Sequence, residues 1–111
     1  MEFNEYQQCA STTAEWHGRN DEYKKMYLCM GLAGETGELI EKMKKVIRND
    51  GGVVSDEMRT LIKLEVGDVL WYLSQVAKEL NITLDEAATA NIAKLSDRAK
   101  RGVIASVGDT R

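Results

Sequence analysis

Apolar side chains recur at intervals of three and four residues along most of the chain, which is the period of an α-helix. No stretch alternates apolar and polar residues over the length of a strand. We therefore expect an all-α protein in which four helices joined by short turns form a bundle. The pattern predicts a first helix from about Asn4 to His17, a second from about Asp21 to Arg48, a third from Ser55 to about Leu80, and a fourth from Thr83 to about Lys100.

Residues typical of helix ends stand at these boundaries. Ser55 and Thr83 carry side-chain oxygens that accept hydrogen bonds from the first amides of a helix, and the residues after Thr83 have the spacing of a capping box. We expect Asn4 to cap the first helix in the same way. Gly51 or Asn49 can adopt the left-handed conformation that ends the second helix.

Two pairs of carboxylates stand three residues apart, Glu35 with Glu38 and Glu65 with Asp68. A three-residue step keeps both members of a pair on one face of a helix. Two such helices side by side could direct four carboxylates toward one point, and four acids stay ionised together only if cations neutralise them. Oxygen ligands of this kind favour hard divalent cations, Mg²⁺ above all, with Mn²⁺ as a substitute.

Glycines recur beside these acids. Gly31, Gly34 and Gly37 follow one another at three-residue steps, and Gly67 lies inside the second acidic pair. Each glycine costs about 1 kcal/mol relative to alanine in a helix interior. We therefore expect a compensating need, which is either the close approach of another helix or room for a ligand above the carboxylates. An acidic pair by itself is more often a solvated helix face, and the glycines strengthen the metal hypothesis here.

The composition limits the functional classes. A chain of 111 residues with 43% hydrophobic and 30% charged residues fits one globular domain, residues 1–111, with residues 103–111 as a mobile tail. The net charge of −3 offers no basic surface for nucleic acid, and no apolar run is long enough to cross a membrane. Without a signal-peptide pattern, we expect a cytoplasmic protein whose Cys9 and Cys29 are reduced packing thiols.

The combination of motifs resembles the MazG-like all-α nucleoside triphosphate pyrophosphohydrolases, from about Tyr6 to Arg111. The matching segments are Gly31-Leu-Ala-Gly-Glu-Thr-Gly-Glu-Leu39, Gly67-Asp-Val-Leu-Trp-Tyr-Leu73 and Asn91-Ile-Ala-Lys-Leu-Ser-Asp-Arg98. The resemblance implies hydrolysis of a nucleoside triphosphate, expected to be a deoxynucleotide or a non-standard nucleotide, to the monophosphate and pyrophosphate. Two or three Mg²⁺ ions held by the four acids would activate a water molecule, which Glu38 would orient or deprotonate.

Polar and basic residues on two helices are candidates for phosphate and nucleotide contacts. Lys42 lies four residues after Glu38, so an ordinary ion pair with that acid is the plainer interpretation. On the fourth helix the candidates share one face, which is either solvated or, by resemblance, closes over the triphosphate. The candidates are Lys42 and Lys45 on the second helix and Asn91, Lys94 and Arg98 on the fourth.

Trp16 and Trp71 are the candidates for stacking on the nucleobase, although an aromatic residue in a small bundle more often belongs to the core. His17 is the single histidine, and we interpret it as a helix-end residue and not as a catalyst. A di-iron carboxylate bundle generally uses Glu-x-x-His on two helices, which this chain lacks. The other alternative is a non-catalytic helical interaction module whose acids are solvated.

Apolar residues occupy more than one side of the first and fourth helices, including Phe3 and Trp16 on the first and Leu84, Ile92 and Leu95 on the fourth. A monomeric bundle would leave part of this surface exposed, and a large exposed apolar patch usually marks an interface. Relatives in the resembled family assemble as dimers or as tetramers built from dimers. We therefore expect a homodimer at minimum, with a tetramer as the main alternative.

Overall fold

The computed structural model of the chain is helical and describes residues 1–18 and 20–104. None of these residues forms a strand, so the predicted all-α class is confirmed. Residues 105–111, which make up most of the predicted tail, lie outside the described part. The helices are α1 (Phe3–Ser11), α2 (Glu22–Asp50), α3 (Asp56–Glu79) and α4 (Leu84–Arg101).

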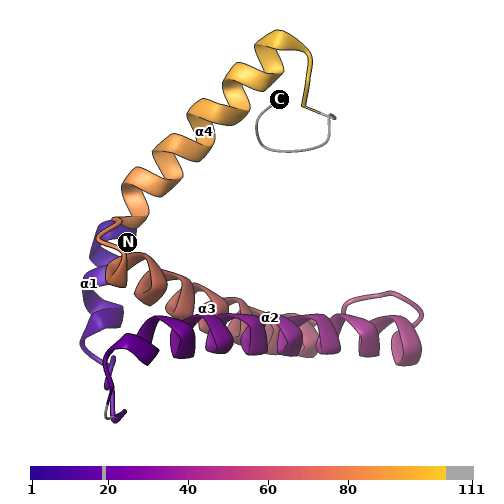
Figure 1. The fold of residues 1–111 in the computed structure, drawn as a ribbon. Helices are drawn as coiled ribbons and strands as arrows, with labels where there is room; N and C mark the ends of the chain where they lie inside the picture. The colour runs from indigo at the N-terminus through magenta and orange to yellow at the C-terminus, as the bar shows by residue number, and fades with distance from the viewer. Residues whose placement is uncertain (19, 105–111) are drawn as a thin grey trace.

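The two long helices α2 and α3 form an antiparallel hairpin, which is the largest packed unit of the molecule (Figure 1). Leu28 and Val46 of α2 are buried along it. At Gly31 an added Cβ would lie 2.1 Å from the ring of Tyr72, so the close approach that we expected for the glycines is confirmed at this position. At the other three glycines of the acidic motifs, an added Cβ would meet nothing within 4 Å.

Gln7 of α1 joins three helices. Its side-chain nitrogen donates to the carbonyl oxygens of Ser74, at 3.1 Å, and Ile82, at 3.0 Å. Its side-chain oxygen accepts from the amide of Leu84, at 3.1 Å, where α4 begins. Gln7 is 8% exposed, so these bonds satisfy polar groups that have little access to water.

The local signals at the ends of α3 and α4 act as predicted. The hydroxyl of Ser55 accepts from the Met58 amide at 3.1 Å, and Thr83 forms a capping box with Glu86. Gly51, at φ 61°, adopts the left-handed conformation that ends α2. These contacts lie within a few residues of one another in the chain, which is why the sequence alone reveals them.

The boundaries predicted for the first helix are wrong. A capping box between Glu2 and Glu5 starts the helix earlier, and Asn4 instead accepts a hydrogen bond from the Asp85 amide of α4 at 3.1 Å. The helix ends at Ser11, well before His17. Cys9 and Cys29, predicted to be packing thiols, are both free and exposed.

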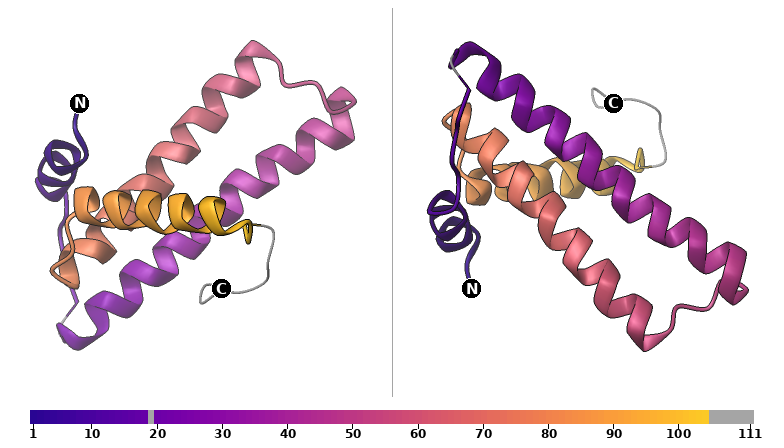
Figure 2. Two further views of the ribbon diagram at one scale, coloured as in Figure 1. Left: turned by 90° about the horizontal axis from the view of Figure 1, so that it is seen from above. Right: turned by 90° about the horizontal axis from the view of Figure 1, so that it is seen from below.

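The four helices do not close into a bundle within one chain. α4 packs against α1 near its start and then extends away from the hairpin, so the molecule is open on one side (Figure 1). Seen from above, α4 crosses over the hairpin (Figure 2). The radius of gyration is 17.1 Å, whereas a compact domain of this length has about 13 Å. The four predicted helices are therefore confirmed, but within a single chain they do not close into a bundle.

No helix among the described residues combines the length and the apolar composition that crossing a membrane requires.

Replacing Gln7 with alanine tests its role as the junction of three helices. Gln7→Ala leaves two carbonyl groups and one amide without their partner, so we expect the free energy of unfolding to fall by about 2 to 3 kcal/mol. Urea unfolding followed by circular dichroism measures this change. The control is Gln8→Ala, an exposed neighbour expected to stay within about 0.5 kcal/mol of the parent chain. Equal losses in both variants would contradict the assigned role.

Candidate metal centre

Three of the four predicted acids meet where α2 packs against α3. Glu35, Glu65 and Asp68 each offer one carboxylate oxygen, and these oxygens lie within 4.8 Å of one another. Glu35 and Glu65 are half-buried, while Asp68 is exposed. Glu38 lies one turn further along α2, is exposed and does not belong to this group. The structure therefore brings together acids from both predicted pairs, while the metal-binding role of the four acids and the catalytic role of Glu38 stay predictions.

The three acids repel one another. Partial burial raises the pKa of Glu35, and the negative charges of Asp68, Glu65 and Glu38 raise it further, in that order. Ionised oxygens held this close favour a bound cation, because a cation removes the repulsion and replaces the lost hydration. The chemistry of the donor set thus fits a hard divalent metal ion.

Lys42 already neutralises part of this charge. Its ammonium group lies 3.0 Å from a carboxylate oxygen of Glu65, and both side chains are largely shielded from water. The pair joins α2 to α3, whereas the sequence suggested a partner on the same helix, Glu38.

Two tyrosines border the acids. Burial raises the pKa of Tyr72, with further contributions from the charges of Tyr27, Glu35 and Asp68. Burial also raises the pKa of Tyr6, and Asp68 adds to this shift. The sequence pattern gave no sign of a role for Tyr6 here, because its closeness to Asp68 arises only when α1 packs against α3.

An aromatic pocket of about 70 Å³ lies beside Tyr72. Trp16 meets Tyr27 edge to face with ring centroids 5.3 Å apart, and Trp71 meets Tyr72 in the same way at 5.0 Å. Both tryptophans predicted for base stacking therefore line one pocket. Its lining residues are Ala14, Glu15, Trp16, Lys24, Tyr27, Leu28, Trp71, Tyr72 and Gln75.

The two indole nitrogens of this pocket differ in their hydrogen bonds. Trp71 donates to the hydroxyl of Thr13 at 3.0 Å. The indole nitrogen of Trp16 is buried and has no partner among the described residues. A buried donor without a partner costs about 1 to 3 kcal/mol, so it usually indicates a missing water or ligand. A second cavity, of about 290 Å³, opens between Trp16, Tyr27 and the exposed His17.

The residues predicted to contact phosphate are not brought together within one chain. Lys42 lies at the acids, while Lys45 is exposed nearby on α2. Asn91 and Lys94 are exposed on α4, and Arg98 is 3% exposed. Because α4 extends away from the hairpin, these three residues do not join the acidic group in the part of the chain that the structure describes (Figure 1).

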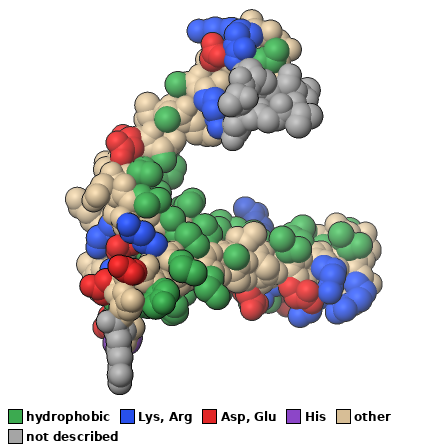
Figure 3. All heavy atoms as spheres, viewed as in Figure 1, with side chains coloured by type: hydrophobic (Ala, Val, Ile, Leu, Met, Phe, Trp, Pro, Cys, Tyr) green, Lys and Arg blue, Asp and Glu red, His purple; other side chains and the backbone are tan. Residues whose placement is uncertain are grey.

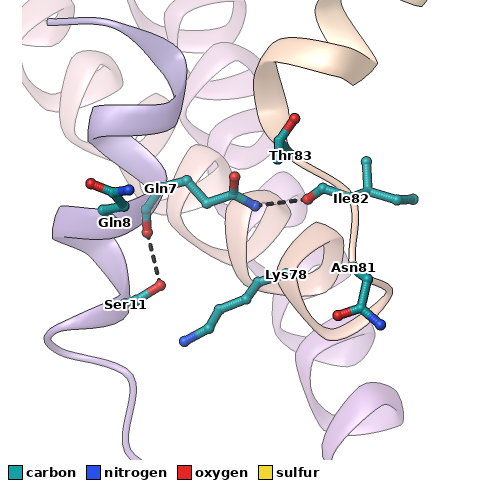
Figure 4. Close-up of a pocket in the computed structure, with 7 residues that line it drawn as sticks. All are labelled: Gln7, Gln8, Ser11, Lys78, Asn81, Ile82 and Thr83. Carbon is teal, nitrogen blue, oxygen red and sulfur yellow. Dashed lines mark hydrogen bonds between the residues drawn. The ribbon is translucent and has the colours of Figure 1, made fainter.

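Another cavity lies away from the acids and carries none of this chemistry. It measures about 370 Å³ and opens between α1 and the turn that joins α3 to α4 (Figure 4). Lys78 is its only charged lining residue, and the side chain of Gln7 is fully engaged in hydrogen bonds. No carboxylate lines this cavity, so the acidic group remains the better candidate site.

The fold and the acids define an all-helical protein whose two central helices carry a carboxylate group suited to a divalent cation. Residues 24–103 match the family described as MazG nucleotide pyrophosphohydrolase domain, and the chain belongs to this family. The chain is 40% identical over 114 residues to the Gene 37 protein of Mycobacterium phage L5, and each sequence is covered in full. No solved structure matches the chain. The family inferred from the motifs is thus confirmed.

Glu35→Gln tests the repulsion among the acids. In the folded protein the pKa of Glu35 is raised above its usual value of 4.5. The contribution of Glu35 to the stability of the fold is therefore present below pH 4.5 and is lost as the pH rises through the folded pKa. With a chelator present, we expect the variant and the parent chain to have the same melting temperature at about pH 4. At about pH 7 we expect the variant to have the higher melting temperature. Differential scanning calorimetry measures both midpoints.

Glu41→Gln is the matched control for this charge removal on the same helix. Lys44 lowers the pKa of Glu41 through a hydrogen bond and its positive charge, so removing this acid should not raise the melting temperature at neutral pH. Equal stabilisation by both substitutions would show that net charge, and not repulsion at the acidic group, is responsible.

Proposed function

We propose that this protein hydrolyses a nucleoside triphosphate to the nucleoside monophosphate and pyrophosphate, using Mg²⁺ bound at the acidic group. The observation that carries this proposal is the meeting of Glu35, Glu65 and Asp68 from two helices. Members of the MazG family are nucleotide pyrophosphohydrolases, which supports the reaction class. The aromatic pocket beside Tyr72 supports a substrate that carries a flat ring.

The chain's own residues divide the chemistry among them. Glu35, Glu65 and Asp68 would hold the cation, which supplies a polarised phosphate oxygen and a bound water of lowered pKa. Glu38 is exposed one turn along α2, where a carboxylate can orient or deprotonate the attacking water. Lys42, once released from Glu65, can turn its ammonium group to the triphosphate.

The aromatic pocket would select the base. Trp16 and Trp71 offer ring surfaces for stacking, and the buried indole nitrogen of Trp16 offers a donor to an acceptor on the ring. Lys24 on the pocket wall is held by Glu79 at 2.8 Å, so its charge is already neutralised. We propose a deoxynucleotide or a non-standard nucleotide as the substrate.

Two substitutions test the reaction. We expect Asp68→Asn and Glu38→Gln each to lower kcat by at least about a hundredfold, since each removes a metal ligand or a base. Pyrophosphate release from a panel of natural and damaged triphosphates, with Mg²⁺ or Mn²⁺, measures the effect. Glu41→Gln, one turn beyond Glu38, is the control and should keep the activity of the parent chain. Parental turnover in both test variants would rule out the proposed site.

Metal binding separates this proposal from a non-catalytic interaction module. Millimolar Mg²⁺ should raise the melting temperature of the parent chain, because a ligand that binds only the folded state stabilises it. Asp68→Asn should lose most of this increase and Glu41→Gln should keep it. An unchanged melting temperature of the parent chain in Mg²⁺ would favour solvated acids and a binding role.

A further inference from the structure

The glycines of the acidic motifs differ in what surrounds them. At Gly31 an added Cβ would strike the ring of Tyr72, so packing explains this glycine. At the other three, Gly34, Gly37 and Gly67, an added Cβ would meet nothing within 4 Å among the described residues. Glycine destabilises a helix interior relative to alanine, so a glycine that nothing packs against needs another explanation.

The backbone gives no reason for a glycine at Gly34. α2 continues through it as one helix from Glu22 to Asp50, and the glycines with positive φ lie at or just beyond helix ends. α3 is the described helix that packs most closely against α2, and none of its atoms comes within 4 Å of a Cβ added at Gly34. Gly34 therefore leaves a stretch of helix backbone exposed.

Gly34 shares one side of α2 with residues from both ends of the proposed substrate site. At about 100° per residue, it is turned about 20° from Tyr27 and about 40° from Glu38. Tyr27 lines the aromatic pocket, and Glu38 is an acid of the first motif. Lys45 follows on the same side, two turns after Glu38. An aromatic, a bare, an acidic and a basic position thus succeed one another along this side of the helix.

The polar edge of the hairpin is open to solvent. Figure 3 shows acidic side chains along the edge that looks away from α4, with Lys and Arg side chains beyond them toward the turn between α2 and α3. Gly34, Glu38 and Lys45 are all exposed. A ligand can therefore reach the backbone at Gly34 without displacing another described helix of the chain.

Features that favour a ligand lie on both sides of Gly34 along α2. On one side, the indole nitrogen of Trp16, in the wall of the aromatic pocket, is buried without a partner among the described residues. On the other side, Glu35 belongs to the acidic group. At about 1.5 Å per residue, Gly34 lies about 10 Å along the helix from Tyr27 and about 6 Å from Glu38. A base in the pocket and phosphates at the acids would leave the sugar over Gly34.

We propose that the nucleotide lies lengthwise along this side of α2, with its sugar against the bare backbone at Gly34. This inference rests on the proposed function, because it assigns the base to the aromatic pocket and the phosphates to the acidic group. Gly34 is then a specificity-determining position. It admits a ligand that has a sugar ring between its base and its phosphates, and a side chain at this position would occupy the place of that ring.

Gly34→Leu fills the space over the backbone. We expect it to raise the dissociation constant of a nucleoside triphosphate at least about tenfold, which is the smaller cost of one group too many in a fitted pocket. The probe is the α,β-methylene analogue of the triphosphate that the parent chain hydrolyses fastest, because this analogue resists cleavage at the bond whose hydrolysis releases pyrophosphate. Isothermal titration calorimetry in Mg²⁺ measures the dissociation constant.

Gly37→Leu is the matched control on the same helix. Gly37 is also exposed with open space around it, but it is turned about 80° from Tyr27 and about 100° from Glu38. The control should keep the dissociation constant of the parent chain within about twofold. Leucine is a better helix former than glycine, so both variants should melt at a higher temperature than the parent chain. Weaker binding by a more stable variant cannot come from unfolding.

Inorganic triphosphate separates the sugar from the phosphates, because it carries neither a sugar nor a base. Its dissociation constant in Mg²⁺ should be the same for Gly34→Leu and the parent chain. The rise in melting temperature that millimolar Mg²⁺ produces should also be unchanged, since the acids are intact. Equal losses of affinity for inorganic triphosphate and for the nucleotide analogue would overturn the placement of the sugar at Gly34.

The outcomes separate this inference from the proposed function. If the parent chain hydrolyses triphosphates and Gly34→Leu binds the analogue as tightly as the parent chain does, the placement of the sugar is wrong and the proposed function stands. A parent chain that binds no nucleotide contradicts both. Sedimentation equilibrium tests whether a second chain, and not a nucleotide, approaches Gly34. A change in mass caused by Gly34→Leu would overturn the inference.

Discussion

The packing of α2 against α3 is the constraint on which the rest of the molecule depends. It places three like charges within 4.8 Å of one another, so the helix pair must hold together against their repulsion. The contact of Tyr72 with Gly31 and the ion pair of Lys42 with Glu65 lie at the same interface. Close packing and the ammonium group of Lys42 thus offset the repulsion among the acids, and a bound metal ion would remove this repulsion.

Directional hydrogen bonds from α1 hold the start of α4. Gln7 and Asn4 of α1 accept from the first amides of α4, at Leu84 and Asp85, and Gln7 also binds the turn before it. These bonds fix where α4 begins and how it leaves α1. They leave the apolar residues further along α4 uncovered by the hairpin, which is why one chain remains open.

The acidic group and the aromatic pocket form one continuous region through Tyr72. Its ring contacts the Gly31 backbone, its neighbour Trp71 lines the pocket, and the acids raise its pKa. In the proposed function, the phosphates of a nucleotide would lie at the acidic group and its base would lie in the adjacent aromatic pocket. The family match supports the proposed reaction class, and this continuity supports a substrate that has a charged end and a flat end.

The sequence by itself determined the helices, most of their ends and the family. Helical period and the caps at Ser55 and Thr83 depend on residues within one or two turns, so local chemistry was sufficient. It also predicted that Glu35, Glu65 and Asp68 lie close together, because a three-residue step keeps two side chains on one helix face, and the motifs identified the MazG family.

Only the tertiary structure decided what each face meets. Lys42 pairs with an acid on another helix, and Asn4 accepts a hydrogen bond from the start of α4. Tyr6 lies near Asp68 only because α1 packs against α3. The tertiary structure also directed α4 away from the hairpin, so the predicted bundle does not close. Periodicity gives the direction of a side chain about its own helix axis, but the surface that covers it depends on contacts between residues far apart in the chain.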